Sequence, residues 1–76
     1  MLDSFYNDMN RHILLKNNVR YYRTLKHLTQ SDLANLCNVS KNTISSIETG
    51  KLSCSAYLAY LLCLKLGVPF EQLFYF

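Results

Sequence analysis

The amino-acid sequence predicts an all-α fold, a compact domain of five helices, and three observations lead to this prediction. Half of the 76 residues are hydrophobic, which suffices for a folded core and argues against a disordered chain. The chain contains only two glycines and one proline, and β-branched residues do not form the runs that are typical of strands. Apolar residues recur three or four positions apart, as on one face of a helix. A chain of this length forms one domain at most.

The first part of the chain, residues 1–12, is assigned to an N-terminal extension, and residues 13–76 to the folded domain. Phe5, Met9 and Ile13 lie four residues apart, and Ser4 is a candidate N-cap. This pattern fits either one or two extra helical turns or a loosely attached arm.

The first helix of the domain is expected over residues 12–26. Leu15, Val19 and Tyr22 share one face of this helix. His27 is expected to end it, because many helices end with a left-handed residue and His tolerates that conformation.

The second helix is expected over residues 30–37. Thr29 is its candidate N-cap, and Asp32 in the first turn complements the positive end of the helix dipole. Asn38 is expected to make a sharp turn after it, since Asn is among the residues most tolerant of positive φ. The residues of this helix expected in the core are Leu33, Leu36 and Cys37.

The third helix is expected over residues 41–49, with Ser40 as its N-cap and Gly50 as its C-cap. Ile44 and Ile47 are three residues apart and anchor one face in the core. The opposite face carries short polar side chains and one lysine: Lys41, Asn42, Thr43, Ser45 and Ser46.

The last two helices follow with short connections. The fourth is expected to begin after Ser53 or Ser55 and to end at Leu66, before Gly67. Pro69 can occupy the first turn of a short fifth helix over residues 69–74.

Composition excludes several classes of protein. No apolar run approaches the length of a membrane span, and the N-terminus lacks the features of a secretory signal, so we expect a cytoplasmic protein without a membrane partner. The sequence contains no paired carboxylates, Cys–His dyad, glycine-rich phosphate loop or metal-ligand spacing. We therefore expect no enzyme, no cofactor and no metal site. Three cysteines without a C-x-x-C pair are expected to be free, Cys37 and Cys63 in the core and Cys54 in a loop.

The charge distribution favours a polyanionic partner. The formal net charge is +3, and all 8 lysines and arginines lie between the acidic residues near the two ends, Asp3 and Asp8 on one side and Glu71 on the other. By itself this excess is weak evidence, because many solvated protein faces carry a similar charge.

The spacing of residues 30–48 is typical of a helix-turn-helix. A small residue, Ala34, lets two helices cross closely, and Asn38 turns the chain between them. Apolar side chains fix the crossing at Leu33, Cys37, Val39, Ile44 and Ile47.

The chain resembles the Cro/phage-repressor-type, or Xre-like, helix-turn-helix regulators. The segments that carry the resemblance lie between residues 17 and 74 and are NNVRYYR, LTQSDLA, NVSKNTISSIETGK and LGVPFEQLF. The resemblance implies a lambda-repressor-like domain of five helices that regulates transcription by binding double-stranded DNA. His27 and Asn38 stand where the family usually has glycine, and Cys54 where it often has proline.

The resemblance also implies roles for individual residues. Base contacts in the major groove are expected from Lys41, Asn42 and Ser46, and a base or phosphate contact from Thr43. Contacts to the DNA backbone are expected from Gln30, Thr49 and Lys51, and Arg20 is a weaker candidate for the same role. Arg23 and Glu48 match a structural ion pair between the first and third helices. The chemistry agrees, because Lys donates to guanine and Asn pairs with adenine; without the motif, the same residues would be an ordinary solvated helix face.

The fourth helix is apolar on two sides, so we expect both sides to be buried. The cover on the second side is either the N-terminal segment, through Phe5, Tyr6 and Met9, or a second subunit. The aromatic C-terminus favours the second subunit. The expected homodimer interface consists of Tyr57, Tyr60, Leu61, Leu64, Phe70, Phe74 and Phe76.

Two functions remain open at the level of sequence. The first is a dimeric, sequence-specific DNA-binding transcriptional regulator, with repression as the expected role and residues 41–49 as the helix in the major groove. The alternative is a protein-interaction module of the same fold, such as an antitoxin or an antirepressor-like adaptor, with little DNA binding.

Overall fold

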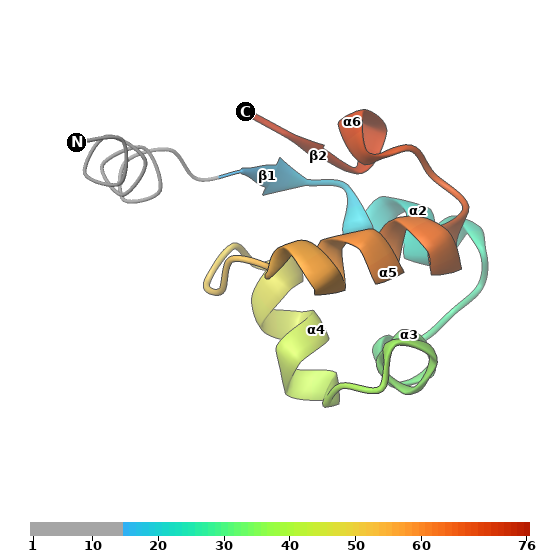
Figure 1. Cartoon of the computed structure of the whole chain (residues 1–76). Helices are drawn as coiled ribbons and strands as arrows, with labels where there is room; N and C mark the ends of the chain where they lie inside the picture. Colours follow the sequence, from blue (N-terminus) through green and yellow to red (C-terminus); the bar gives the residue numbers. More distant parts are fainter. Residues whose placement is uncertain (1–14) are drawn as a thin grey trace.

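A computed structural model describes residues 15–76 of the chain (Figure 1). The expected features of the extension, including the pattern of Phe5, Met9 and Ile13, lie outside the described residues. In chain order the elements are β1 (Lys16–Asn17), α2 (Val19–Leu25), α3 (Gln30–Cys37), α4 (Lys41–Glu48), α5 (Ala56–Leu66), α6 (Phe70–Leu73) and β2 (Phe74–Tyr75). The predicted five-helix, all-α fold is confirmed for the described part of the chain, with one short sheet added to it.

The helices enclose a single core around α5. In Figure 1, α5 lies between the α3–α4 pair on one side and α6 with the two strands on the other. The side chains of Leu33, Ile44, Ile47, Leu62, Leu66, Leu73 and Val19 are fully buried. Burial of one such side chain contributes about 1.5–3 kcal/mol. This set therefore supplies much of the free energy that holds the helices together.

The first helix begins later than the sequence predicts, at Val19 instead of residue 12. Lys16 and Asn17 form β1, which pairs antiparallel with β2 in the register Lys16 with Tyr75 and Asn17 with Phe74. Asparagine side chains here bind backbone groups that a helix would use: Asn17 Oδ1 accepts from Val19 N at 3.2 Å. The N-terminal strand is therefore joined to the C-terminus, and Leu15 before it is 43% exposed.

The helix ends follow the sequence prediction closely. His27 and Asn38 both adopt the left-handed conformation with φ of 57°. Thr29 forms a capping box with Asp32, because the Thr29 hydroxyl accepts from Asp32 N and the Asp32 carboxylate accepts from Thr29 N. Ser40 and Ser55 accept hydrogen bonds in the same way at the starts of α4 and α5. At the other end of the chain α6 is shorter than predicted, because Phe74 leaves the helix to join β2.

Two expected core residues lie outside the core. Leu36 is 46% exposed, because the buried stripe of α3 runs through Leu33, Ala34 and Cys37, and Leu36 lies more than a quarter-turn from the centre of that stripe. Cys63 is half-buried at the edge of the stripe that α5 presents to the core. All three cysteines are free, and burial raises the pKa of Cys54, in the loop before α5, to about 11.

Candidate nucleic-acid interface

The turn between α3 and α4 fixes the two helices at a sharp angle. Asn38 takes the left-handed conformation, and Val39 N donates to the carbonyl oxygen of Ala34 at 2.9 Å. Ser40 then starts α4 by accepting from Thr43 N at 3.1 Å. The backbone N–H groups of Asn38, Val39 and Thr43 therefore have local partners. The turn needs no glycine because asparagine tolerates a φ of 57°.

Helix α4 has an apolar face and a polar face. Ile44 and Ile47 are buried against the core, with 0% and 1% of their surface exposed. Lys41 and Asn42 project from the first turn into solvent, whereas Thr43, Ser45 and Ser46 are half-buried. Lysine and asparagine offer the donors and acceptors that contact base edges, and the short serine side chains let another surface approach the helix closely.

The hydroxyl groups along α4 are not equally available. Thr43 Oγ1 lies 2.9 Å from Ser40 Oγ, within the helix cap. Thr49 Oγ1 donates to the carbonyl oxygen of Ser45 at 3.0 Å, so its hydrogen is not free for a phosphate oxygen, which can only accept. The side chain of Lys51 is exposed in the next loop, where Lys51 N donates to the carbonyl oxygen of Ser46.

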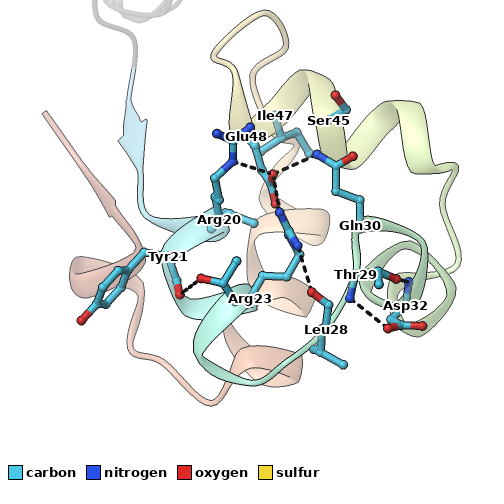
Figure 2. A network of polar contacts seen from close by, with 12 residues as sticks. Arg20, Tyr21, Arg23, Leu28, Thr29, Gln30, Asp32, Ser45, Ile47 and Glu48 are labelled. Atoms are coloured by element: carbon cyan, nitrogen blue, oxygen red, sulfur yellow. Dashed lines mark hydrogen bonds and ion pairs between the residues drawn. The ribbon is translucent and has the colours of Figure 1, made fainter.

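Glu48, the last residue of α4, binds side chains from two other helices, α2 and α3 (Figure 2). Arg23 donates to it twice, from Nε to Oε2 at 2.6 Å and from Nη2 to Oε1 at 3.1 Å. Gln30 Nε2 donates to Oε1 at 3.0 Å, and Arg20 Nε lies 3.5 Å from the same oxygen. The Arg23–Glu48 pair that the sequence suggested is therefore present, but it belongs to a larger cluster of Arg20, Arg23, Gln30 and Glu48.

The cluster keeps its carboxylate charged. The side chain of Glu48 is 0% exposed, and burial acts to raise its pKa. The hydrogen bonds from Arg23 and Gln30 and the charge of Arg23 outweigh burial, so the pKa of Glu48 lies below its ordinary value. Arg23 completes its own hydrogen bonds by donating from Nη1 to the carbonyl oxygen of Leu28 at 2.9 Å. The two arginines differ in exposure, 66% for the side chain of Arg20 and 11% for that of Arg23.

Three contacts at this site were missed at the level of sequence. Gln30 and Arg20 were expected to face DNA, and the structure shows that each also binds Glu48. Asn17 Nδ2 donates to the carbonyl oxygen of Ile47 at 2.9 Å and so joins the start of the domain to the end of α4. Partners 18 to 30 residues apart leave no periodic signal in a single sequence.

Comparison with known proteins identifies the family to which this arrangement of helices belongs. The model of the helix-turn-helix family matches residues 19–73, which begins at α2 and ends at the last residue of α6. The chain belongs to the helix-turn-helix family. Together with the relatives below, this match shows the Xre-like type that the sequence suggested.

Known members of the helix-turn-helix family are similar in sequence and in fold. An uncharacterized HTH-type transcriptional regulator of Methanocaldococcus jannaschii is 45% identical over 60 residues, which is 79% of this chain and 91% of that protein. The crystal structure of the clp gene regulator ClgR from Corynebacterium glutamicum is 31% identical with a TM-score of 0.66, over 68% of this chain and 55% of ClgR. The restriction-modification controller protein C.AhdI from Aeromonas hydrophila is 25% identical with a TM-score of 0.68, over 72% of this chain and 83% of C.AhdI. These relatives make the chain a helix-turn-helix transcriptional regulator, a class distinct from enzymes.

Among residues 15–76 of this domain, neither a metal-binding cluster nor a membrane-spanning helix is present. Histidine, cysteine and acidic side chains of that range do not gather in a group that could hold a metal ion. None of the helices in the same range has the length and apolar character needed to cross a membrane.

The face formed by α5, α6 and the C-terminus is apolar and open. Tyr57, Tyr60, Leu64, Phe70 and Phe76 are between 49% and 78% exposed. Leu61 is half-buried against the core. A shallow groove runs along this face and is lined by Ala56, Tyr60, Cys63, Leu64, Gly67, Val68, Pro69 and Phe70.

Phe74 was predicted to lie in the dimer interface, but the structure buries it. It is only 6% exposed, because its pairing with Asn17 in the two-stranded sheet turns its side chain into the core. Its ring packs on that of Phe70 with 5.2 Å between the ring centroids. Phe74 thus supports Phe70 from beneath and does not itself lie on the open face.

Proposed function

We propose that this protein is a sequence-specific DNA-binding regulator that inserts α4 into the major groove. The observation that carries the proposal is the pair of faces of α4: Ile44 and Ile47 hold one face in the core, and the opposite face presents Lys41 and Asn42 to solvent. A helix held rigidly by its buried face can place exposed donors at fixed positions along a groove.

The polar residues divide into two groups by what they can offer. Lys41, Asn42 and Ser46 are proposed to contact bases, with Thr43 contributing an oxygen from the helix cap. Gln30, Lys51 and Arg20 are proposed to contact phosphates and so to set the position of the domain on the duplex. Thr49 is left out of the second group because its hydroxyl hydrogen is already donated to the carbonyl oxygen of Ser45.

We further propose that the protein binds DNA as a homodimer through the face formed by α5 and α6, and that it represses transcription. Tyr57, Tyr60, Leu64, Phe70 and Phe76 supply exposed apolar side chains in one region of the surface. A twofold dimer would present two copies of α4 to half-sites about one helical turn apart. Repression then follows if such a site overlaps a promoter.

The test of this function is a titration of labelled duplexes at several salt concentrations. The DNA upstream of the protein's own gene, or a site selected from a random duplex library, should bind about 1000-fold or more tightly than an unrelated duplex. Affinity should fall steeply as salt rises, because each phosphate contact releases counterions. Equal affinity for all duplexes would contradict sequence-specific binding. Sedimentation with and without the selected duplex gives the stoichiometry, and one chain per symmetric site would contradict the dimer.

The open apolar face also supports the second candidate, a protein-interaction module of the same fold with little DNA binding. The same titration separates the two, because an interaction module should not prefer one duplex over another at any salt concentration. Its Lys41→Ala and Asn42→Ala variants would also behave like the wild-type protein.

A further inference from the structure

The carboxylate of Glu48 lies where the elements expected to face DNA meet. Its side chain has no exposed surface, yet two of its partners belong to residues proposed to contact phosphates: Gln30 at the start of α3 and Arg20 in α2. Figure 2 shows both side chains converging on Glu48 from different elements, with Arg23 between them. The family ion pair accounts for Arg23 alone and leaves the contacts of Gln30 and Arg20 without a role.

The contact with Glu48 determines which way the Gln30 amide is turned. An ionised carboxylate only accepts hydrogen bonds, so Gln30 must present Nε2 to it at 3.0 Å and turn Oε1 away. One N–H of Nε2 is then used, and the other remains available for an acceptor. Gln30 has many rotamers when unrestrained, and fixing one in advance removes the entropic cost of ordering this side chain from binding.

Arg20 contacts Glu48 through one guanidinium nitrogen, and its other two nitrogens remain available as donors. Its Nε faces Glu48 at 3.5 Å, and among the described residues its two Nη groups donate to no other side chain or carbonyl. The side chain of Arg20 is 66% exposed, so those donors can be reached from solvent. The cluster holds two arginines and one carboxylate, so one positive charge remains, and Arg20 carries it at the surface. Free N–H groups and a residual positive charge are what a phosphate oxygen binds.

We propose that Glu48 is a positioning residue for a DNA phosphate contact made by Gln30 and Arg20. The buried carboxylate fixes the Nε2 donor of Gln30 and the guanidinium plane of Arg20 before DNA arrives, while Arg23 holds the carboxylate in place. This inference rests on the proposed DNA-binding function. The inference adds one role to that function. Glu48, whose buried side chain does not reach DNA, controls affinity for the DNA backbone without affecting the choice of bases.

The test is a cycle of substitutions measured by DNA affinity on the selected duplex. Glu48→Gln keeps the shape of the side chain and removes its charge, and it should weaken binding by about tenfold, since charge-assisted hydrogen bonds are about twice as strong as neutral ones. In an Arg20→Ala/Gln30→Ala background the same substitution should change affinity by less than about twofold, because no positioned side chain is left. In a Lys51→Ala background, the matched control, the tenfold effect should persist. The ranking of duplexes that differ in one base pair should be unchanged throughout.

Loss of folding is excluded by recording thermal unfolding of every variant and titrating DNA below the lowest transition. A second measurement needs no variant: side-chain amide relaxation by NMR in the free wild-type protein should show the Gln30 amide nearly as rigid as the backbone. Gln72 is the internal control, since it is exposed and its side chain makes no hydrogen bond among the described residues.

Three results would overturn the inference. An equal loss from Glu48→Gln in every background would make Glu48 a purely structural residue. A Gln30 amide as mobile as that of Gln72 would show that the donor is not held in advance. Both results leave DNA binding itself intact, whereas failure of the wild-type protein to bind any duplex would overturn the proposed function together with this inference.

Discussion

Helices α4 and α5 each bury one stripe of side chains in the same core, but they differ in what their other faces carry. The outer face of α4 offers Lys41, Asn42 and short hydroxyl side chains, and its end is fixed by a buried ionic cluster. The outer face of α5 offers Tyr57, Tyr60 and Leu64, which are 56% to 73% exposed and make no ionic contact. The comparison shows that the buried stripes of both helices hold the fold together, whereas their outer faces differ in chemistry. That difference supports the proposal that α4 binds nucleic acid and α5 binds protein.

Truncating one side chain in the buried stripe of α4 should have the largest effect on stability. Ile47→Ala should lower the free energy of unfolding by about 2–5 kcal/mol, because it deletes methyl groups from a position that is 1% exposed. Tyr57→Ala, on the outer face of α5, should change it by no more than about 0.5 kcal/mol. Urea titration of both variants measures the difference. A large loss of stability from Tyr57→Ala would mean that its face is covered within the monomer.

Substitutions on the polar face of α4 should separate base contacts from phosphate contacts. Asn42→Ala should reduce discrimination between operator variants by about 1–3 kcal/mol at one base pair. Lys51→Ala should weaken binding to all duplexes alike and lower the slope of log affinity against log salt by about one. Anisotropy titrations on a panel of single-base variants distinguish the two patterns. The same pattern from both substitutions would contradict the division.

A charge on the outer face of α5 should break the dimer without unfolding the domain. Leu64→Glu places a carboxylate at the centre of the proposed interface and should raise the dimer dissociation constant about tenfold or more, since burying an unpaired charge is costly. Leu36→Glu is the matched control, because Leu36 is similarly exposed, at 46%, but lies on α3. Sedimentation equilibrium of both variants provides the measurement. If both substitutions had the same effect, the face formed by α5 and α6 would not be the interface.

Acid should weaken the end of α4. The folded protein holds the Glu48 proton less tightly than the unfolded chain does, since Arg23 and Gln30 keep the pKa of Glu48 below its ordinary value despite its burial. The unfolded state then binds more protons below about pH 4.3, so the stabilisation from this group is complete above that pH and is lost as the pH falls through the folded value. The Glu48→Gln variant should be less stable than the wild-type protein at pH 7. Between pH 7 and pH 3 its melting temperature should fall by less than that of the wild-type protein. The same acid sensitivity in both proteins would exclude Glu48 as a source.

The smallest effects are expected at the two left-handed turns. His27→Gly and Asn38→Gly should each raise the free energy of unfolding by about 0.5–1 kcal/mol, because a side chain at φ of 57° is strained. The gain should be smaller for Asn38, since asparagine tolerates this conformation better. Chemical denaturation resolves such changes when the variants are measured side by side. A loss of stability in both would mean that the side chains contribute more than the strain costs.

The sequence by itself determined the parts of this protein that depend on neighbours within one or two helical turns. Thr29 and Ser40 cap helices, and Asn38 and His27 take left-handed turns. The buried faces are selected by a spacing of four between Leu33 and Cys37 and of three between Ile44 and Ile47. These interactions join residues close in the chain, so their spacing alone predicted the helix-turn-helix.

Only the tertiary structure decided the contacts between distant segments. Asn17 pairs with Phe74 in a sheet that replaced the expected start of the first helix and drew Phe74 into the core. Gln30 and Arg20 were expected to be free for DNA, and the fold brings both to the carboxylate of Glu48. Such pairings depend on how the helices pack in three dimensions. A buried charge requires hydrogen-bond donors, and packing decides which donors lie within reach of it.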